Sequence, residues 1–170
     1  PAHPLFDRAL MTSYPPGSTF KPTQGLILLQ EGIITTGTAY PCHHGYISGR
    51  LRAGGHSHAS PLALKPALQT SCNAFFCYGF KAMIDRRSKY GNSANAFEVW
   101  KKHLVSMGYG YRLGIDLPGE SRGFIPNDRF YNKIYGKGHW SANTIISVSI
   151  GQGEIGATPV QIANLCATIA

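Results

Sequence analysis

The stretch Tyr14-Pro-Pro-Gly-Ser-Thr-Phe-Lys-Pro22 places a serine hydroxyl and a lysine amine three residues apart, directly after a turn-forming Pro-Pro-Gly. Residues i and i+3 of a helix lie on one face, so a helix that begins at Ser18 brings the amine of Lys21 beside the hydroxyl. The amine can then take the serine proton, as a serine nucleophile requires. The positive end of the helix dipole favours the resulting alkoxide over a nearby ammonium. The plainer alternative is that Ser18 only caps the helix.

Length and composition describe one globular domain. The chain has 170 residues, of which 43% are hydrophobic and 14% charged, so it can bury a core and is unlike a disordered chain. The net charge is +8, but lysine and arginine are scattered, with short groupings only at 86–87 and 101–102. No helix-turn-helix, zinc-finger or RNA-binding signature accompanies them. A solvated basic surface is therefore predicted, and no nucleic-acid partner is expected.

The two ends of the chain and its four cysteines are the features that could indicate its cellular compartment. The sequence has no signal peptide and no apolar run approaching the roughly 20 residues that span a bilayer. It begins abruptly at Pro1 and stops at Ala170 within an expected helix, so we expect a piece of a longer protein whose anchor lies elsewhere. The cysteines form no Cys-x-x-Cys pair, and their spacing leaves open whether they pair or stay free; they are Cys42, Cys72, Cys77 and Cys166.

Turn signals and hydrophobic patterns predict a mainly helical chain after a turn-rich start over residues 1–17. The predicted helices cover residues 18–30, 60–70, 73–85, 95–107 and 159 to the end. Gly32 is the expected stop of the first helix, and Ser60-Pro61 and Thr158-Pro159 are the expected caps of the second and the last. Asn95 is the expected cap of the helix over 95–107, with Glu98 as its capping-box partner. Loops are predicted over 35–59 and 109–140, and a short strand or buried segment over 144–150, before a turn at Gly151-Gln-Gly153. No obvious sheet is expected.

A second motif, Ser71-Cys72-Asn73, follows Lys21 by fifty residues and falls on a break between two predicted helices. Ser-x-x-Lys followed by Ser-x-Asn is far more specific than either pattern alone, and the pair is typical of penicillin-binding proteins and serine β-lactamases. A second hydroxyl within reach of Lys21 can relay a proton to a leaving amine. An asparagine amide can bind the peptide group of a substrate and hold the lysine in place.

The wider sequence resembles the transpeptidase domain of class B penicillin-binding proteins, most closely the penicillin-binding protein 2 group. The stretches that carry this resemblance are Pro4-Leu-Phe-Asp-Arg-Ala9, Tyr14 to Pro22, Gly114-Ile-Asp-Leu-Pro-Gly-Glu120 and Ile150-Gly-Gln-Gly-Glu-Ile-Gly-Ala-Thr-Pro159, with the second motif in order between them. The resemblance implies the mainly α, helical part of the α+β penicillin-binding protein and serine β-lactamase-like fold. Residues 1–170 would form a partial transpeptidase domain without most of its sheet.

The resemblance also implies a reaction. The chain would be part of a peptidoglycan D,D-transpeptidase, in which Ser18 attacks the D-Ala-D-Ala carbonyl of a stem peptide and releases D-Ala. Lys21 would be the base, Ser71 the proton relay and Asn73 a substrate contact, while the backbone N–H of Ser18 gives half of an oxyanion hole. An amine of a neighbouring strand would resolve the acyl-enzyme, β-lactams would trap it, and no cofactor is required.

Location and partners follow from the same resemblance. The full-length protein is expected at the periplasmic face of the bacterial inner membrane, with a glycosyltransferase of the cell-elongation machinery as partner. Three alternatives stay open: another penicillin-recognising serine hydrolase such as a β-lactamase or carboxypeptidase, a β-lactam sensor that is acylated without turnover, and a basic module that binds polyanions. No second glutamate is placed by motif to activate water, which favours a transpeptidase over a β-lactamase.

Two of the matching stretches are predicted to be structural. Gly114 to Glu120 should fix a turn, with Asp116 as a polar anchor. Gln152-Gly153 and Thr158-Pro159 should set a loop and a helix start, because turn and cap chemistry explain these residues without a catalytic role.

The third motif of the family is missing. No Lys-Thr-Gly or Lys-Ser-Gly occurs in the 170 residues. In the family this motif supplies a cation and a hydroxyl for the substrate carboxylate, and the strand beside it gives the other oxyanion donor. We therefore expect the chain by itself to be catalytically impaired or inactive.

A loop between the two motifs is rich in metal-binding side chains. Zinc is held in proteins by cysteine and histidine in tetrahedral sites, but the spacing here matches no standard zinc finger. Solvated or hydrogen-bonded histidines are the alternative. The candidate zinc ligands are Cys42, His43, His44, His56 and His58.

Overall fold

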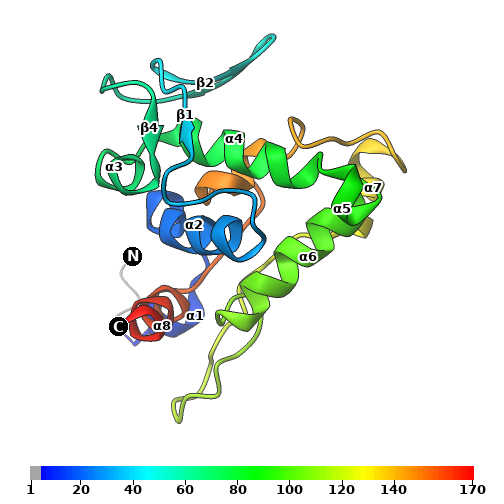
Figure 1. The fold of residues 1–170 in the computed structure, drawn as a ribbon. Coiled ribbons are helices and arrows are strands. Elements are labelled where there is room, and N and C mark those ends of the chain that lie inside the picture. Colours follow the sequence, from blue (N-terminus) through cyan, green and yellow to red (C-terminus); the bar gives the residue numbers. More distant parts are fainter. Residues whose placement is uncertain (1–4) are drawn as a thin grey trace.

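The computed structural model describes residues 5–170, so the predictions for Pro1 and Pro4 lie outside the described residues. Helices dominate, with two small two-stranded sheets beside one end of them (Figure 1). In chain order the elements are α1 (Arg8–Met11), η1 (Gly17–Phe20), α2 (Lys21–Gln30), β1 (Ala39–Tyr40), β2 (Gly45–Ser48), β3 (Leu51–Gly54), β4 (Leu62–Ala63), α3 (Leu64–Gln69), α4 (Asn73–Ile84), α5 (Arg87–Tyr90), α6 (Ser93–Ser106), α7 (Asp128–Tyr135), η2 (Ile146–Ile150) and α8 (Pro159–Ile169). Within residues 5–170 every helix is too short or too polar to cross a bilayer.

Helix α4 lies at the centre of the core. Apolar residues occupy most of its sequence, so it can be buried on nearly all sides. Helix α2, the 3₁₀ helix η2, strand β2 and helix α6 all pack against it (Figure 1). This packing holds α2, whose start carries the first motif, against the segment that leads from the second motif into α4.

An aromatic cluster anchors the segment that leads into α2. Phe20 is fully buried and meets Trp100 and Tyr109 edge-on, with ring centroids 6.1 and 5.8 Å away. The indole N–H of Trp100 donates to Oε1 of Gln24 at 2.7 Å, which ties α6 to α2. Because Phe20 is buried against these two rings, the position of Ser18, in the same 3₁₀ turn, is fixed as well.

The predicted helices that carry the motifs are confirmed within a few residues. The helix predicted over 18–30 begins as the turn η1, continues as α2 and ends just before Gly32. The break at 71–73 separates α3 from α4. Thr158 caps α8 through the reciprocal hydrogen bonds of a capping box with Gln161.

The prediction of a loop over 35–59 and of no sheet is wrong. Strands β2 and β3 form an antiparallel hairpin, and β1 pairs with β4. The hairpin has an apolar anchor in Tyr46, which is only 1% exposed and whose hydroxyl donates to Oδ1 of Asn143 at 2.7 Å. Strands this short leave no run of alternating residues from which the pattern of a sheet can be recognised.

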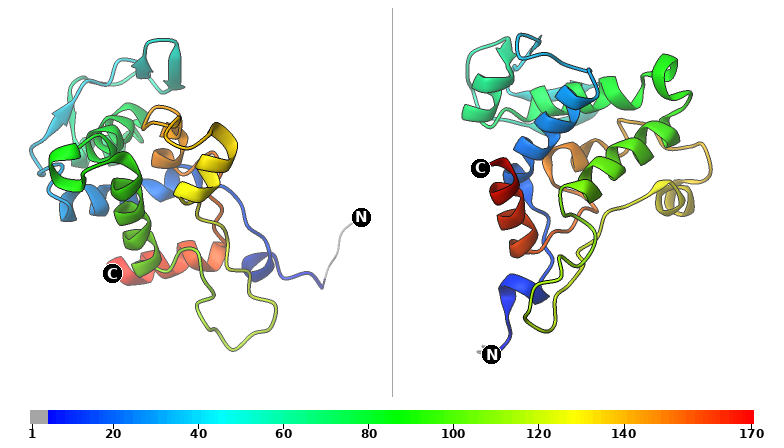
Figure 2. Two further views of the ribbon diagram at one scale, coloured as in Figure 1. Left: turned by 90° about the vertical axis from the view of Figure 1, so that its right-hand side faces the viewer. Right: turned by 60° about the horizontal axis from the view of Figure 1, so that its bottom comes forward.

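The prediction of surface loops throughout 109–140 is wrong at α7. Asn127 caps this helix by accepting from the backbone N–H of Phe130 at 2.8 Å, and Tyr131 points into the core with no exposed area. The remainder, between α6 and α7, is a long loop that extends away from the helices, as predicted (Figure 2).

Three local predictions need correction. The helix predicted from Ser60-Pro61 begins at Leu64, because residues 62–63 pair with β1 and Oγ of Ser60 accepts from the N–H of Cys42 instead. Asn92, and not Asn95, caps α6, and its side chain accepts from the N–H of Asn95 at 2.9 Å. The segment 144–150 is buried as predicted but contains the 3₁₀ helix η2 and no strand.

Candidate active site

Ser18 lies on an exposed turn that is clamped by a distant part of the chain. The N–H of Gly17 donates to the carbonyl of Gly151 at 2.7 Å. Just upstream, Tyr14 and Ala157 exchange two backbone hydrogen bonds, of 3.0 and 2.9 Å. The Ser18 side chain is exposed while its neighbours are held from both sides, so it can meet a substrate in a fixed position.

Lys21 brings the two motifs together. Its side chain is buried, with 2% exposed, and its Nζ lies 3.0 Å from Oγ of Ser18. The same nitrogen donates to the carbonyl oxygen and the Oγ of Ser71, at 2.7 and 2.8 Å. The two serine hydroxyls are themselves 3.0 Å apart. The amine and the two hydroxyls therefore form a closed triangle in which a proton can pass along any side.

Burial of Lys21 favours its neutral form. The cost of removing the ammonium from water lowers the pKa of Lys21 from 10.5, and the nearby thiols of Cys72 and Cys77 oppose this only in part. None of the ion pairs found within residues 5–170 involves Lys21. A neutral amine in contact with a serine hydroxyl is the state that a general base needs.

The three consecutive residues of the second motif make three different contacts. Ser71 adopts a left-handed backbone conformation, with φ of 54°, which turns its side chain back toward Lys21. Cys72 caps α4 by accepting from the N–H of Phe75 at 3.4 Å. Asn73, the first residue of α4, donates from Nδ2 to the carbonyl of Gly54 at 2.6 Å.

The role expected for Asn73 is therefore changed in part. Its amide was expected to hold Lys21, but in the structure it holds the end of the β2–β3 hairpin. Lys21 is held by the backbone carbonyl of Ser71 instead, because the left-handed turn at Ser71 places that carbonyl closer to the amine. The amide oxygen of Asn73 keeps its capacity to accept a hydrogen bond.

The five candidate zinc ligands do not gather in one place. Within residues 5–170 no group of three or more histidine, cysteine, aspartate or glutamate side chains is arranged to hold a metal ion. Cys42 is buried, whereas His43, His44 and His56 are exposed. His58 is half-buried, and its Nδ1 lies 3.2 Å from the carbonyl oxygen of Ala59.

Cys42 instead faces Cys72, which is not among the five candidate zinc ligands. The two Sγ atoms lie 2.6 Å apart, and both side chains are buried. Burial and the hydrogen bond with the Cys72 thiol raise the pKa of Cys42 to about 12. In the sequence, the one hint of this contact is that Cys72 lies inside the second motif, Ser71-Cys72-Asn73.

The turn at 114–120 is anchored by a different residue from the one predicted. Glu120 is buried, and its two carboxylate oxygens accept from the N–H groups of Leu113 and Gly114 at 2.5 and 3.0 Å. Asp116 is exposed. Glu120, at the end of the loop, accepts from both backbone N–H groups at once, whereas Asp116 lies at the tip of the loop and makes neither bond.

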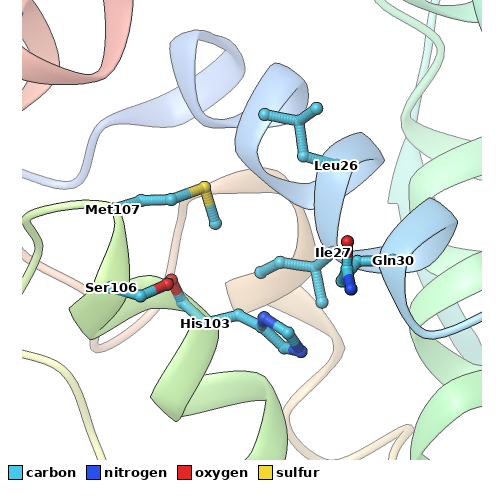
Figure 3. A pocket seen from close by; sticks show the side chains of 6 residues that line it. All are labelled: Leu26, Ile27, Gln30, His103, Ser106 and Met107. Atoms are coloured by element: carbon cyan, nitrogen blue, oxygen red, sulfur yellow. The ribbon is translucent and has the colours of Figure 1, made fainter. Parts of the chain in front are cut away.

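A hollow of about 350 Å³ opens between α2 and α6, away from both motifs (Figure 3). Leu26, Ile27 and Gln30 line it from α2, and His103, Ser106 and Met107 from the end of α6. No residue of the Lys21 triangle contributes to its wall. The candidate active site is thus a surface site at the start of α2 rather than this hollow.

Related proteins share the sequence along nearly its whole length. The chain is 33% identical to the peptidoglycan D,D-transpeptidase MrdA of Acinetobacter baumannii over 173 aligned residues, which cover 98% of the chain and 24% of that protein. It is 30% identical to MrdA of Escherichia coli, over 96% of the chain and 24% of that protein. The chain therefore spans about a quarter of the length of these relatives.

Solved structures agree with the fold described above. The chain resembles penicillin-binding protein 2 of Pseudomonas aeruginosa, solved in complex with WCK 5153, with a TM-score of 0.80 and 24% identity over 98% of the chain and 36% of that structure. It also resembles penicillin-binding protein 2 of Helicobacter pylori in its complex with MreC, with a TM-score of 0.77 and 27% identity over 94% of the chain and 28% of that structure. The helical part of this α+β fold is thus confirmed. Since the family model described as the penicillin binding protein transpeptidase domain matches residues 2–170, the chain belongs to that family.

Proposed function

We propose that the chain carries the nucleophile and base of a peptidoglycan D,D-transpeptidase. Ser18 attacks the carbonyl carbon of a D-Ala-D-Ala stem peptide, forms an ester with it and releases D-Ala. An amine of a second stem peptide then attacks the ester and completes the cross-link. The observation that carries this proposal is the buried amine of Lys21, which contacts the hydroxyls of Ser18 and Ser71 together.

The triangle supplies a path for the proton. Lys21 takes the proton of Ser18 as the ester forms, across the 3.0 Å contact. The proton then reaches the nitrogen of the departing D-Ala through Ser71, whose Oγ lies 2.8 Å from the amine and 3.0 Å from Oγ of Ser18. The same path runs in reverse when the acceptor amine loses its proton. Because these side chains make every proton transfer, the reaction needs no cofactor, and a zinc ion in the loop 42–58 has no part in it.

Substrate contacts come from the edges of the triangle. The backbone N–H of Ser18, in the turn η1 that precedes α2, would stabilise the charge that develops on the substrate oxygen. The amide of Asn73 is oriented by Gly54, which leaves its oxygen for the N–H of a substrate peptide. The Lys-Thr-Gly motif, which would hold the substrate carboxylate, does not occur in the 170 residues, so we expect slow acylation by this chain.

The wider setting belongs to the same proposal. Residues 1–170 form part of a transpeptidase domain that acts at the periplasmic face of the bacterial inner membrane. β-Lactams are its proposed inhibitors, because they would react with Ser18 in place of the stem peptide. A glycosyltransferase of the cell-elongation machinery is the proposed partner, and a related chain, 28% identical with a TM-score of 0.80, comes from a peptidoglycan synthase complex that coordinates polymerization and crosslinking.

Acylation by a fluorescent penicillin tests the proposal. The chain is incubated for hours at millimolar penicillin, and the modified residue is located by mass spectrometry after digestion. We expect partial, slow modification at Ser18 and none in Ser18→Ala. Thr19→Ala is the matched control, since this neighbouring hydroxyl is bonded to the carbonyl of Pro16 and lies outside the triangle. Modification at another residue would contradict a nucleophilic Ser18, and rapid stoichiometric labelling would contradict the expected impairment.

A further inference from the structure

The segment 151–157, which we call the clamp segment, holds the turn of the nucleophile at both of its own ends. At one end the carbonyl of Gly151 accepts from the N–H of Gly17 at 2.7 Å. At the other end Ala157 exchanges two backbone hydrogen bonds with Tyr14, of 3.0 and 2.9 Å. The position of the turn therefore depends on what fixes the clamp segment between these two ends.

The other side of the clamp segment is held by the stretch 124–131. Phe124 and Gly156 exchange two backbone hydrogen bonds, of 2.7 and 2.8 Å. Gly156 and Ala157 are consecutive, and their backbone groups point to opposite sides, as those of neighbouring residues in an extended strand do. The clamp segment thus lies between the turn of the nucleophile and the stretch 124–131, as a middle strand lies between its two neighbours.

A side-chain hydrogen bond joins the same two stretches. The hydroxyl of Tyr131, on α7, donates to Oε2 of Glu154 at 3.0 Å. Burial of Tyr131 and the nearby charge of Glu154 both raise the pKa of Tyr131, so the hydroxyl stays protonated and remains a donor. None of the ion pairs found within residues 5–170 involves Glu154. Its carboxylate is therefore held by a neutral hydroxyl and by no cation of the described chain.

The packing of α7 does not need this hydroxyl. The ring of Tyr131 is fully buried and lies against Phe97, Phe130 and Trp140, with ring centroids 5.5, 5.4 and 5.7 Å away. A phenylalanine ring would keep these three contacts. What the hydroxyl adds is the bond to Glu154, in keeping with the rule that a buried tyrosine hydroxyl finds a polar partner.

We propose that Tyr131 and Glu154 are positioning residues for Ser18. Their hydrogen bond fixes the middle of the clamp segment, and the two ends of that segment hold the turn that carries the nucleophile. The hydrogen bonds of the Lys21 triangle include neither side chain, so the effect passes through the backbone of the clamp segment. The consequence for acylation rests on the proposed transpeptidase function, whereas the effect on the turn does not.

Hydrogen exchange of single amides, measured by NMR, tests the effect on the turn without reference to activity. The N–H of Gly17 should exchange at least several-fold faster in Tyr131→Phe and in Glu154→Ala, whereas Glu154→Gln keeps an acceptor oxygen and should stay close to the wild-type rate. The slow amides of α4 are the internal reference, because a loss of global stability would accelerate them as well. Tyr135→Phe is the matched control, since this tyrosine lies one turn further along α7 and is 39% exposed. An unchanged rate at Gly17, or an equal acceleration in α4, would overturn the proposal.

The rate of penicillin adduct formation tests the consequence for Ser18. Tyr131→Phe and Glu154→Ala should each lower this rate roughly 10-fold, which is less than the roughly 100-fold that a displacement of about an ångström can cost. Because both substitutions remove the same bond, the double variant should be no slower than the slower single variant, and Glu154→Gln should keep most of the wild-type rate.

Two outcomes of this rate measurement would overturn the positioning role. One is a double variant in which the two losses multiply, and the other is a Glu154→Gln variant as slow as Glu154→Ala. A wild-type chain that is modified at a residue other than Ser18 would instead contradict the proposed function. The exchange of the Gly17 N–H would then still decide whether the bond between Tyr131 and Glu154 holds the turn.

Discussion

Lys21 is held by the backbone of Ser71 as firmly as by its side chain. Its Nζ donates to the carbonyl oxygen of Ser71 at 2.7 Å and to Oγ at 2.8 Å. The carbonyl cannot titrate, so it orients the amine in every protonation state. One N–H of a neutral amine is thereby used by the carbonyl, and the lone pair remains available for the hydroxyl of Ser18.

Lys21→Met should abolish acylation while the fold remains. The substitution keeps a long apolar stem in the buried channel but removes the base, and loss of a general base lowers a rate by roughly 100-fold or more. The rate of penicillin adduct formation at Ser18, measured by mass spectrometry, checks this. Lys65→Met, on α3 outside the site, is the control and should acylate at the wild-type rate.

The protonation of Lys21 gives two pH dependences. Its folded pKa lies below 10.5, so the acylation rate should rise with pH as the amine loses its proton, with a midpoint below 10.5. The folded state also binds fewer protons than the unfolded state between these two pKa values, so the free energy of unfolding should rise with pH in that window. Both slopes should be lost in Lys21→Met; persistence of the rate profile would assign it to another group.

Gly151→Ala should disturb the turn that carries Ser18. Gly151 has φ of 70°, and a Cβ there would lie 2.4 Å from the carbonyl oxygen of Gly17 and 2.6 Å from Cβ of Phe20. Left-handed strain and overpacking together should lower the free energy of unfolding by about 2–4 kcal/mol, measured by urea denaturation. Gly32→Ala, with φ of 61° and open space around it, isolates the strain and should cost about 1 kcal/mol. Equal losses for the two variants would show that the clamp is not tight.

Glu31 should make the fold sensitive to acid. Its carboxylate accepts from Lys89, Tyr90 and His103, each at 2.6 Å, and although burial opposes ionisation, these partners lower the pKa of Glu31 from 4.5 to about 2. The stabilisation is therefore present above pH 4.5 and is lost as the pH falls through about 2.

Glu31→Gln tests this by urea denaturation at several pH values. The variant should be about 2 kcal/mol less stable at pH 7, and the difference should close as the pH approaches 2. Asp85→Asn, which removes an exposed pair with Lys81 on α4, is the control and should change stability by about 0.5 kcal/mol or less. A difference for Glu31→Gln that is constant with pH would contradict the lowered pKa.

Glu120→Ala should loosen the long loop before α7. It leaves the N–H groups of Leu113 and Gly114 without their carboxylate partner, and a buried donor without a partner costs about 1–3 kcal/mol. Asp116→Asn should change stability by about 0.5 kcal/mol or less, because Asp116 is exposed. Hydrogen exchange over 109–123 locates the effect. If the aspartate variant were the more damaging one, the sequence-based prediction of the anchor would be restored.

The sequence was most informative where local chemistry determines the structure. Ser18 and Lys21 are one helical turn apart, and Thr158 caps a helix with its own side chain, so both arrangements follow from short spacings. The contact of Lys21 with Ser71 was predicted from the two motifs together. The motifs indicate that these residues meet in the fold, but they do not specify the distances or hydrogen bonds between them.

The predictions failed where a distant partner decides the structure. The glycine-rich segment forms a hairpin because Tyr46 is anchored by residues far along the chain. Its hydroxyl donates to Asn143, and its ring packs against Tyr78. Asn73 turns to Gly54, and Cys42 to Cys72, for the same reason. Neither residue type nor spacing specifies such contacts, since each depends on where two separate segments come to lie.

The clamp of Gly17 by Gly151 gives the protein an order of assembly. A ribosome releases the chain from its N-terminus, at about 5–20 residues per second, so the turn with Ser18 emerges on the order of ten seconds before the segment that holds it. Until that later segment arrives, the turn with Ser18 lacks this clamp. The final position of the turn is therefore reached only after most of residues 5–170 have been made.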